Sequence, residues 1–97
     1  MPTYVILLKW TDEGRKMVTD STNRVERARD VWKKFGAEMK AFYYVFGRYD
    51  MISIVEAPND AAVAKAVLTA ERWGMSRIET LKAFTETEGA EIIKGLQ

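Results

Sequence analysis

The sequence predicts an α+β fold in which four strands and two helices follow one another in the order βαββαβ. Four segments are rich in β-branched and aromatic residues, and two segments between them carry apolar residues spaced three and four apart. Glycine, proline or polar clusters stand at the borders of these segments. The length suits one small domain, so we predict that residues 1–97 form a single domain.

The first half of the chain contains one strand and one helix. Thr3–Trp10 is predicted to be a strand because Tyr4–Leu8 is a short run of aromatic and β-branched residues, and the sequence Asp12-Glu13-Gly14 ends it. The polar cluster Asp20–Asn23 offers N-caps for a helix that Gly36 ends. The apolar face of this helix consists of Val25, Ala28, Trp32 and Phe35.

A hairpin follows the first helix. Its strands are predicted over Glu38–Phe46 and Met51–Ala57, joined by the short connection Gly47–Asp50. The sequence Pro58-Asn59-Asp60 then begins the second helix, which Gly74 ends. The apolar face of the second helix consists of Val63, Ala66, Val67, Ala70 and Trp73.

The last part of the chain is predicted to hold the fourth strand, over Ser76–Thr85, and a short terminal helix over Ala90–Leu96. The complete order consists of two split β-α-β units, the pattern of the ferredoxin-like fold. That fold has a four-stranded antiparallel sheet with both helices on one face. The face without helices is normally polar.

Both faces of this sheet are predicted to be apolar. In the first strand Ile6 and Leu8 lie on one face and Val5 and Leu7 on the other. In the second strand Phe42, Tyr44 and Phe46 oppose Met39, Ala41, Tyr43 and Val45. A monomer would leave a large apolar patch in water, so we predict a homodimer or higher homo-oligomer, in which two sheets pack face to face as a dimeric α+β barrel.

Composition excludes several classes of function. The chain has no histidine and no cysteine, which removes the commonest general base, the commonest metal ligands and disulfides, and we predict no cofactor and no metal. With 15 basic and 14 acidic residues the net charge is +1, so we expect no nucleic-acid partner. The mixed charges of the first helix, including Arg24, are expected to form a solvated face.

No apolar run reaches the roughly 20 residues that span a membrane, and the first residues lack a basic segment that would begin a secretory signal. We therefore expect no membrane association and a cytoplasmic location.

Gly47, Tyr49 and Asp50 form a turn before an apolar strand that ends in Glu56 and Ala57. This signature, with the N-terminal strand Tyr4-Val5-Ile6-Leu7-Leu8-Lys9-Trp10-Thr11, resembles the GYD-domain family over about residues 3 to 85. The resemblance implies a small ferredoxin-like dimeric domain. The turn is also similar to that of the effector-binding module of feast/famine transcription regulators, where this region lies near a small-molecule site at a subunit interface. The 97 residues contain no helix-turn-helix, so DNA regulation of that kind is not implied.

Two interpretations of the turn remain open. Asp50 and Tyr49 either orient a polar ligand group at the rim of a cavity or only stabilise the hairpin, with Gly47 adopting a positive φ. Aromatic and cationic side chains of the first two strands either surround a planar or anionic ligand or pack in the subunit interface. The predicted ligand-binding set is Lys9, Trp10, Tyr43, Arg48, Tyr49 and Asp50.

The sequence favours a small-molecule-binding oligomeric domain over catalysis. The alternative is a cofactor-free dimeric-barrel enzyme of the monooxygenase or isomerase type, which rests on analogy between folds. A purely structural assembly module is a further alternative. The volume left between the two packed sheets would distinguish these possibilities.

Overall fold

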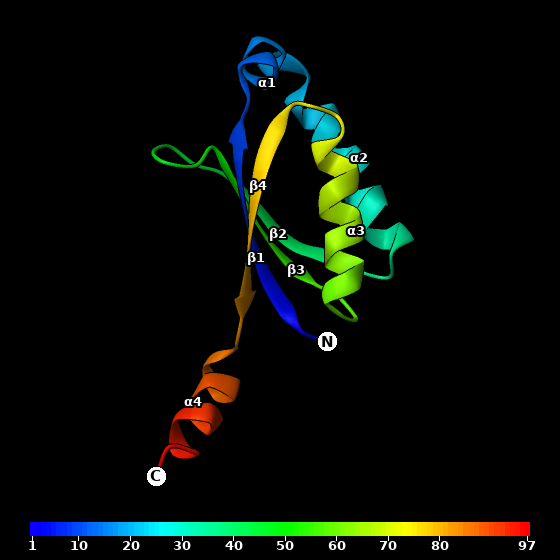
Figure 1. Cartoon of the computed structure of the whole chain (residues 1–97). Coiled ribbons are helices and arrows are strands. Elements are labelled where there is room, and N and C mark those ends of the chain that lie inside the picture. Colours follow the sequence, from blue (N-terminus) through cyan, green and yellow to red (C-terminus); the bar gives the residue numbers. More distant parts are fainter.

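The structure, a computed structural model, describes residues 1–97 as a four-stranded antiparallel sheet with helices against one face (Figure 1). The strand order β2-β3-β1-β4 confirms the predicted ferredoxin-like arrangement. None of the helices has the length and apolar character needed to cross a membrane. The elements are β1 (Thr3–Trp10), α1 (Asp12–Lys16), η1 (a 3₁₀ helix, Val18–Asp20), α2 (Ser21–Lys34), β2 (Glu38–Tyr44), β3 (Met51–Glu56), α3 (Asp60–Glu71), β4 (Ser76–Ala83) and α4 (Glu86–Lys94).

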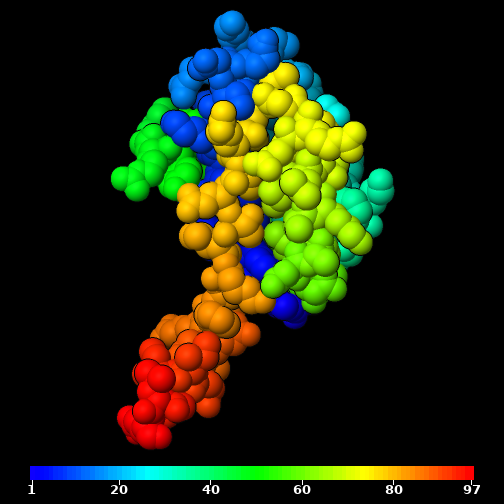
Figure 2. Space-filling view, viewed as in Figure 1, coloured from blue at the N-terminus to red at the C-terminus, as the bar shows by residue number.

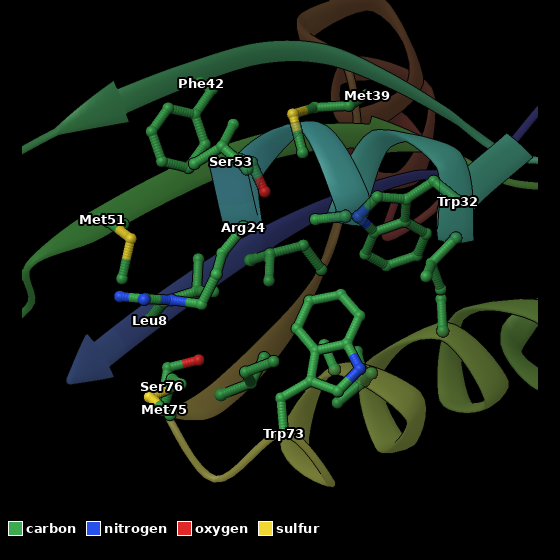
Figure 3. A pocket seen from close by; sticks show the side chains of 18 of the residues that line it. Leu8, Arg24, Trp32, Met39, Phe42, Met51, Ser53, Trp73, Met75 and Ser76 are labelled. Carbon is green, nitrogen blue, oxygen red and sulfur yellow. The ribbon is translucent and has the colours of Figure 1, made fainter. Parts of the chain in front are cut away.

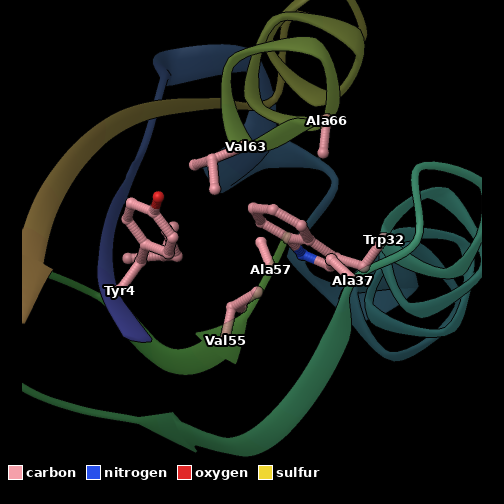
Figure 4. Packing of buried hydrophobic residues seen from close by; sticks show 8 residues of the cluster. Tyr4, Trp32, Ala37, Val55, Ala57, Val63 and Ala66 are labelled. Atoms are coloured by element: carbon pink, nitrogen blue, oxygen red, sulfur yellow. The ribbon is translucent and has the colours of Figure 1, made fainter. Parts of the chain in front are cut away.

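The core lies between the sheet and the pair α2 and α3, which lie side by side over one face (Figures 1 and 4). Val55 of β3 and Ile6 of β1 are almost fully buried there, and Trp32 reaches them from α2. Burying such side chains stabilises the fold by about 1.5–3 kcal/mol each. The cluster consists of Tyr4, Ile6, Trp32, Ala37, Val55, Ala57, Val63 and Ala66.

The segment after β1 contains a short helix where the sequence predicts only the end of a strand. The Thr11 hydroxyl accepts a hydrogen bond of 3.0 Å from the Gly14 amide and caps α1. Gly14 is buried, and a Cβ atom at this position would lie 1.9 Å from the backbone oxygen of Met75. The glycine is therefore required by close backbone packing.

A bulge in β2 changes the predicted face of Met39. The register shifts between Met39 and Ala41, which pair with Val55 and Ile54, so Lys40 is the extra residue. Met39 consequently faces the helices and packs against the core. The prediction that Met39 shares a face with Ala41 was wrong, because strict alternation does not hold across a bulge.

Several boundaries differ from the predicted ones. β2 and β4 each end two residues earlier than expected and β3 one residue earlier, so the β2–β3 connection spans residues 45–50. The terminal helix begins earlier, at Glu86, because Thr85 and Glu88 form a capping box. This helix, α4, stands clear of the body of the domain, and the β2–β3 connection projects beyond the sheet (Figures 1 and 2).

Candidate functional site

The sheet face opposite the helices is apolar at its centre. Val5 and Leu7 of β1 lie beside Ile54 and Ile52 of β3, and Tyr43 of β2 is paired with Ile52. No helix of the chain covers this surface (Figure 1), and the Tyr43 side chain is 60% exposed. We call this surface the open face. Its apolar central residues are Val5, Leu7, Ala41, Tyr43, Ile52, Ile54 and Leu81, and Glu79 of β4 lies among them as the partner of Leu7.

The two ends of the open face carry opposite charges. At one end Glu38 and Glu56 are direct partners across β2 and β3. At the other end Lys9 and Arg77 are direct partners across β1 and β4. Because side chains alternate along a strand, all four lie on the same face as Leu7. The open face therefore has an acidic pair at one end, where Lys40 lies 3.8 Å from Glu38, and a basic pair at the other, where Glu79 is the next residue on this face of β4.

The Asp50 carboxylate closes the end of the hairpin. Its Oδ2 atom accepts a hydrogen bond of 2.9 Å from the Trp10 amide and lies 4.0 Å from Lys9 Nζ and 3.9 Å from Arg15 Nη2. The Asp50 amide donates to the Leu8 carbonyl at 2.9 Å. The Asp50 side chain is only 12% exposed. Through these contacts Asp50 connects β1 to the turn, which is a structural role.

Tyr49, Gly47 and Arg48 occupy the rest of the turn. The Tyr49 hydroxyl donates a hydrogen bond to Glu79 Oε2 on β4, and this bond raises the pKa of Tyr49 because it retains the phenol proton. Gly47 has φ 128°, in the region that favours glycine. The side chain of Arg48 is exposed and forms no ion pair, and the neighbouring Phe46 is fully exposed.

The predicted ligand-binding residues do not line one pocket of the single chain. Lys9, Asp50 and the main chain of Trp10 meet at the turn. The Trp10 side chain points to the helix side of the sheet, where its ring lies 6.4 Å from that of Tyr44, whereas Tyr43 lies on the open face. Any one ligand that touched both Trp10 and Tyr43 would have to reach around the sheet.

Sequence reasoning missed a residue on α2. Arg24 was expected on the solvated face, but its side chain is only 11% exposed and lines a cavity between α2 and the sheet. Its spacing of four to Ala28 and seven to Val31 places it on the apolar face of the helix, a signal that the sequence contains. The expectation was wrong because net charge along a helix does not show which face each charge occupies.

Tyr4, Asp60 and Lys82 form a polar cluster at the edge of the core. The buried Tyr4 donates its hydroxyl proton to Asp60 Oδ1, and Lys82 Nζ lies 3.5 Å from the same oxygen. The hydrogen bond from Tyr4, followed by the charge of Lys82, lowers the pKa of Asp60. The same hydrogen bond raises the pKa of Tyr4. The cluster fixes the start of α3 against β1.

Solved structures share this fold. MtbAldR matches with a TM-score of 0.67 at 14% identity over 88% of this chain and 52% of that chain, so the present chain spans about half its length. FFRP-DM1 matches with a TM-score of 0.57 at 20% identity, over 87% of this chain and 100% of that one. TTHA0845 from Thermus thermophilus matches with a TM-score of 0.55 at 23% identity, over 88% and 95%.

A relative in sequence also comes from Thermus thermophilus and is named glutamine synthetase and cystathionine beta-lyase binding protein. It is 33% identical over 84 residues, which are 86% of this chain and 88% of that protein. The model of the GYD domain family matches residues 4–93 and confirms the predicted resemblance. The chain therefore belongs to the GYD domain family.

Proposed function

We propose that the protein is a homodimeric binding domain whose two sheets pack through their open faces and which binds a small molecule at the rim of that interface. The observation that carries the proposal is the uncovered apolar centre of the open face. Soluble monomers rarely expose a continuous apolar surface of this kind. A second copy of the chain, packed face to face, would remove it from water.

The charges of the open face support one orientation of the two copies. A twofold axis that runs diagonally over the sheet, from the Tyr44 end of β2 to the Ala83 end of β4, places the acidic corner of one sheet, Glu38 and Glu56, over the basic corner of the other, Lys9 and Arg77. An axis along the other diagonal would place like charges together. The charge pattern is therefore self-complementary in the first orientation and repulsive in the second.

The small molecule is proposed to bind beside the Asp50 turn through an anionic group. Arg15 and Lys9 approach the Asp50 carboxylate only to 3.9 and 4.0 Å, and their side chains are 59% and 49% exposed. Arg48 adds a third cation that has no ion-pair partner, so the rim has more positive than negative charge. Tyr43 on the open face offers an aromatic surface to the rest of the ligand.

Charge reversal tests the dimer. Arg77→Glu and Glu56→Arg should each weaken the dimer, and the double variant should restore it, as measured by native mass spectrometry and sedimentation over a range of concentrations. Lys65→Glu on the exposed surface of α3 is the charge-matched control. A monomeric wild-type protein would contradict the proposed dimer. A double variant that stays dissociated would contradict the proposed orientation.

The ligand is tested separately. Native mass spectrometry of the purified protein should detect a retained anionic compound, and Arg48→Gln should lose it while remaining dimeric. If the wild type and the variant are both intact dimers without any bound compound, the proposed dimer stands and the small-molecule part of the proposal is refuted.

A second candidate function is recognition of a metabolic enzyme. The relative named for binding glutamine synthetase and cystathionine beta-lyase favours it, and α4 presents exposed apolar side chains clear of the body (Figure 2). Ile93→Glu should reduce binding to purified glutamine synthetase or cystathionine β-lyase from the same genome, measured by surface plasmon resonance. Ala90→Glu on the same helix is the control, and equal binding by both variants would exclude α4 as the contact.

A further inference from the structure

A cavity of about 60 Å³ lies on the helix side of the sheet, away from the open face (Figure 3). All four strands contribute to one wall, and α2 and α3 form the other. Sixteen of its 20 lining residues are hydrophobic, and none is an aspartate or a glutamate. Leu8, Phe42, Met51, Val67 and Trp73 are among the apolar residues of the lining.

Two buried nitrogen atoms of lining residues have no hydrogen-bond partner. The first is Arg24 Nη2; the neighbouring Nη1 donates to the Met17 carbonyl at 3.0 Å and lies 3.8 Å from Asp20 Oδ2. The second is Trp10 Nε1. Ser53, which is 2% exposed, adds a hydroxyl to the lining. A buried donor without a partner costs about 1–3 kcal/mol, and more when it is charged.

The charge balance of the cavity determines which ligand would relieve this cost. Arg24 keeps its positive charge at any ordinary pH, and Asp20, its only carboxylate partner, is half exposed and sits outside the lining. A neutral acceptor would satisfy the donors but leave the charge without a second partner. A carboxylate would do both, because its two oxygen atoms accept charge-assisted hydrogen bonds from guanidinium and indole N–H groups.

The size of the cavity limits the ligand. Since one water needs about 10–15 Å³ of such volume, the cavity has room for about four to six water-sized groups. Typical drug-sized sites are several times larger. The apolar lining requires that the remainder of the ligand be aliphatic.

We infer that this cavity is a binding site for a short aliphatic carboxylate of about four to six non-hydrogen atoms, held by Arg24 and Trp10 between α2 and the sheet. The site goes beyond the function proposed above, because the ligand at the dimer rim lies on the other side of the sheet and uses different residues. The inference holds whether the chain is a monomer or a dimer.

The indole N–H of Trp10 provides a direct readout. The chain has three tryptophans, and comparison with Trp10→Phe assigns the Trp10 indole signal in a ¹H–¹⁵N correlation spectrum. Butyrate should shift this signal in a saturable way at millimolar concentrations, since so small a ligand binds weakly. Butyramide, which has the same shape without the charge, should bind at least about tenfold more weakly.

Two variants and one control complete the test. Arg24→Met should weaken butyrate binding at least about tenfold, and Ala70→Leu should weaken it by filling the cavity while both donors remain. Lys33→Met, on the exposed side of α2, should bind butyrate as the wild type does. The backbone spectrum reports whether each variant is folded.

Three results would overturn the inference. An unshifted Trp10 signal at saturating salt-matched butyrate would show that the cavity holds only water. Equal shifts with butyrate and butyramide would show an apolar hole without charge selectivity. Unchanged binding by folded Ala70→Leu would place the carboxylate outside the cavity.

Discussion

The two faces of the sheet differ in how they are completed, although the same strands form both. On the helix side Ile6 is 2% exposed within a core that the chain closes by itself. One residue further along β1, Leu7 lies on the open face, where no helix covers it (Figure 1). Similar side chains therefore contribute to two different equilibria. Ile6 stabilises the folded state of one chain, and Leu7 is available for contact between two chains.

The largest expected effect separates these two equilibria. Ile6→Ala should lower the free energy of unfolding by about 2–5 kcal/mol, because it leaves a cavity in the closed core. Leu7→Ala should change the unfolding of an isolated chain much less, and its cost should increase with protein concentration as the dimer forms. Chemical denaturation at several concentrations measures both. Equal losses at every concentration would mean that the two faces do not differ in the proposed way.

A pair of glycines extends the contrast between packed and unpacked surfaces. Gly14→Ala should destabilise the protein by about 1–3 kcal/mol, because the new Cβ would overlap the Met75 backbone oxygen. Gly89→Ala in α4 meets nothing within 4 Å and should instead raise helix stability by about 0.5–1 kcal/mol. Thermal unfolding followed by circular dichroism tests Gly14→Ala, and the helix signal of the folded protein tests Gly89→Ala. A neutral Gly14→Ala would show that the two backbone segments can separate without cost.

Asp50 lies in the β2–β3 connection, beside the end of β1. Asp50→Ala should cost about 1–3 kcal/mol, because the Trp10 amide loses its acceptor in a mostly buried position. Asp50→Asn, which keeps an acceptor oxygen, should cost less. Denaturation should be measured together with ligand retention. A variant that loses a bound compound at unchanged stability would identify Asp50 as a ligand contact rather than a hairpin tie.

The smallest expected effect concerns pH and the helix side alone. The pKa of Asp60 is lower in the folded protein than its ordinary value of 3.8. The ionised carboxylate therefore stabilises the fold when the pH is above 3.8, and this stabilisation is lost as the pH falls through the lower pKa of the folded state. Asp60→Asn should therefore flatten the acid limb of the stability profile. Asp30→Asn, on the exposed surface of α2, should leave the limb unchanged. Parallel acid limbs for wild type and Asp60→Asn would contradict the role of the Tyr4 hydrogen bond.

The sequence predicts the regular parts of this fold because they follow simple periodicities. The alternation of Ile6 and Leu7, and the helical spacing from Val63 to Ala66, place each residue on its correct face. The bulge at Lys40 was not predictable in this way, since one extra residue reverses the alternation without a sequence signal of its own. The cap at Thr11 was visible in the sequence, but a helix of five residues has too little periodicity to identify.

The candidate site was less predictable than the fold. The turn residues Gly47 and Asp50 were identified from a short signature, and the structure places them at one hairpin end. Whether Trp10 and Tyr43 face each other depends on which side of the sheet each occupies, and Trp10 shares the helix side with Tyr44. Arg24 was missed because composition counts its charge, whereas burial and an unpartnered N–H group appear only after tertiary packing.

The position of α4 has a consequence for how the protein can be observed. An isolated helix of nine residues is marginal in water, since about 12–15 residues are needed even in favourable sequences. Its capping box favours the first turn, but the exposed Ile92 and Ile93 have no packing surface within the chain. The helix content of this arm should therefore act as a reporter of occupancy, low in dilute solution and rising when another molecule covers it. Slower hydrogen exchange at residues 86–94 would then report the binding of another molecule to α4, even where exchange in the rest of the domain does not change.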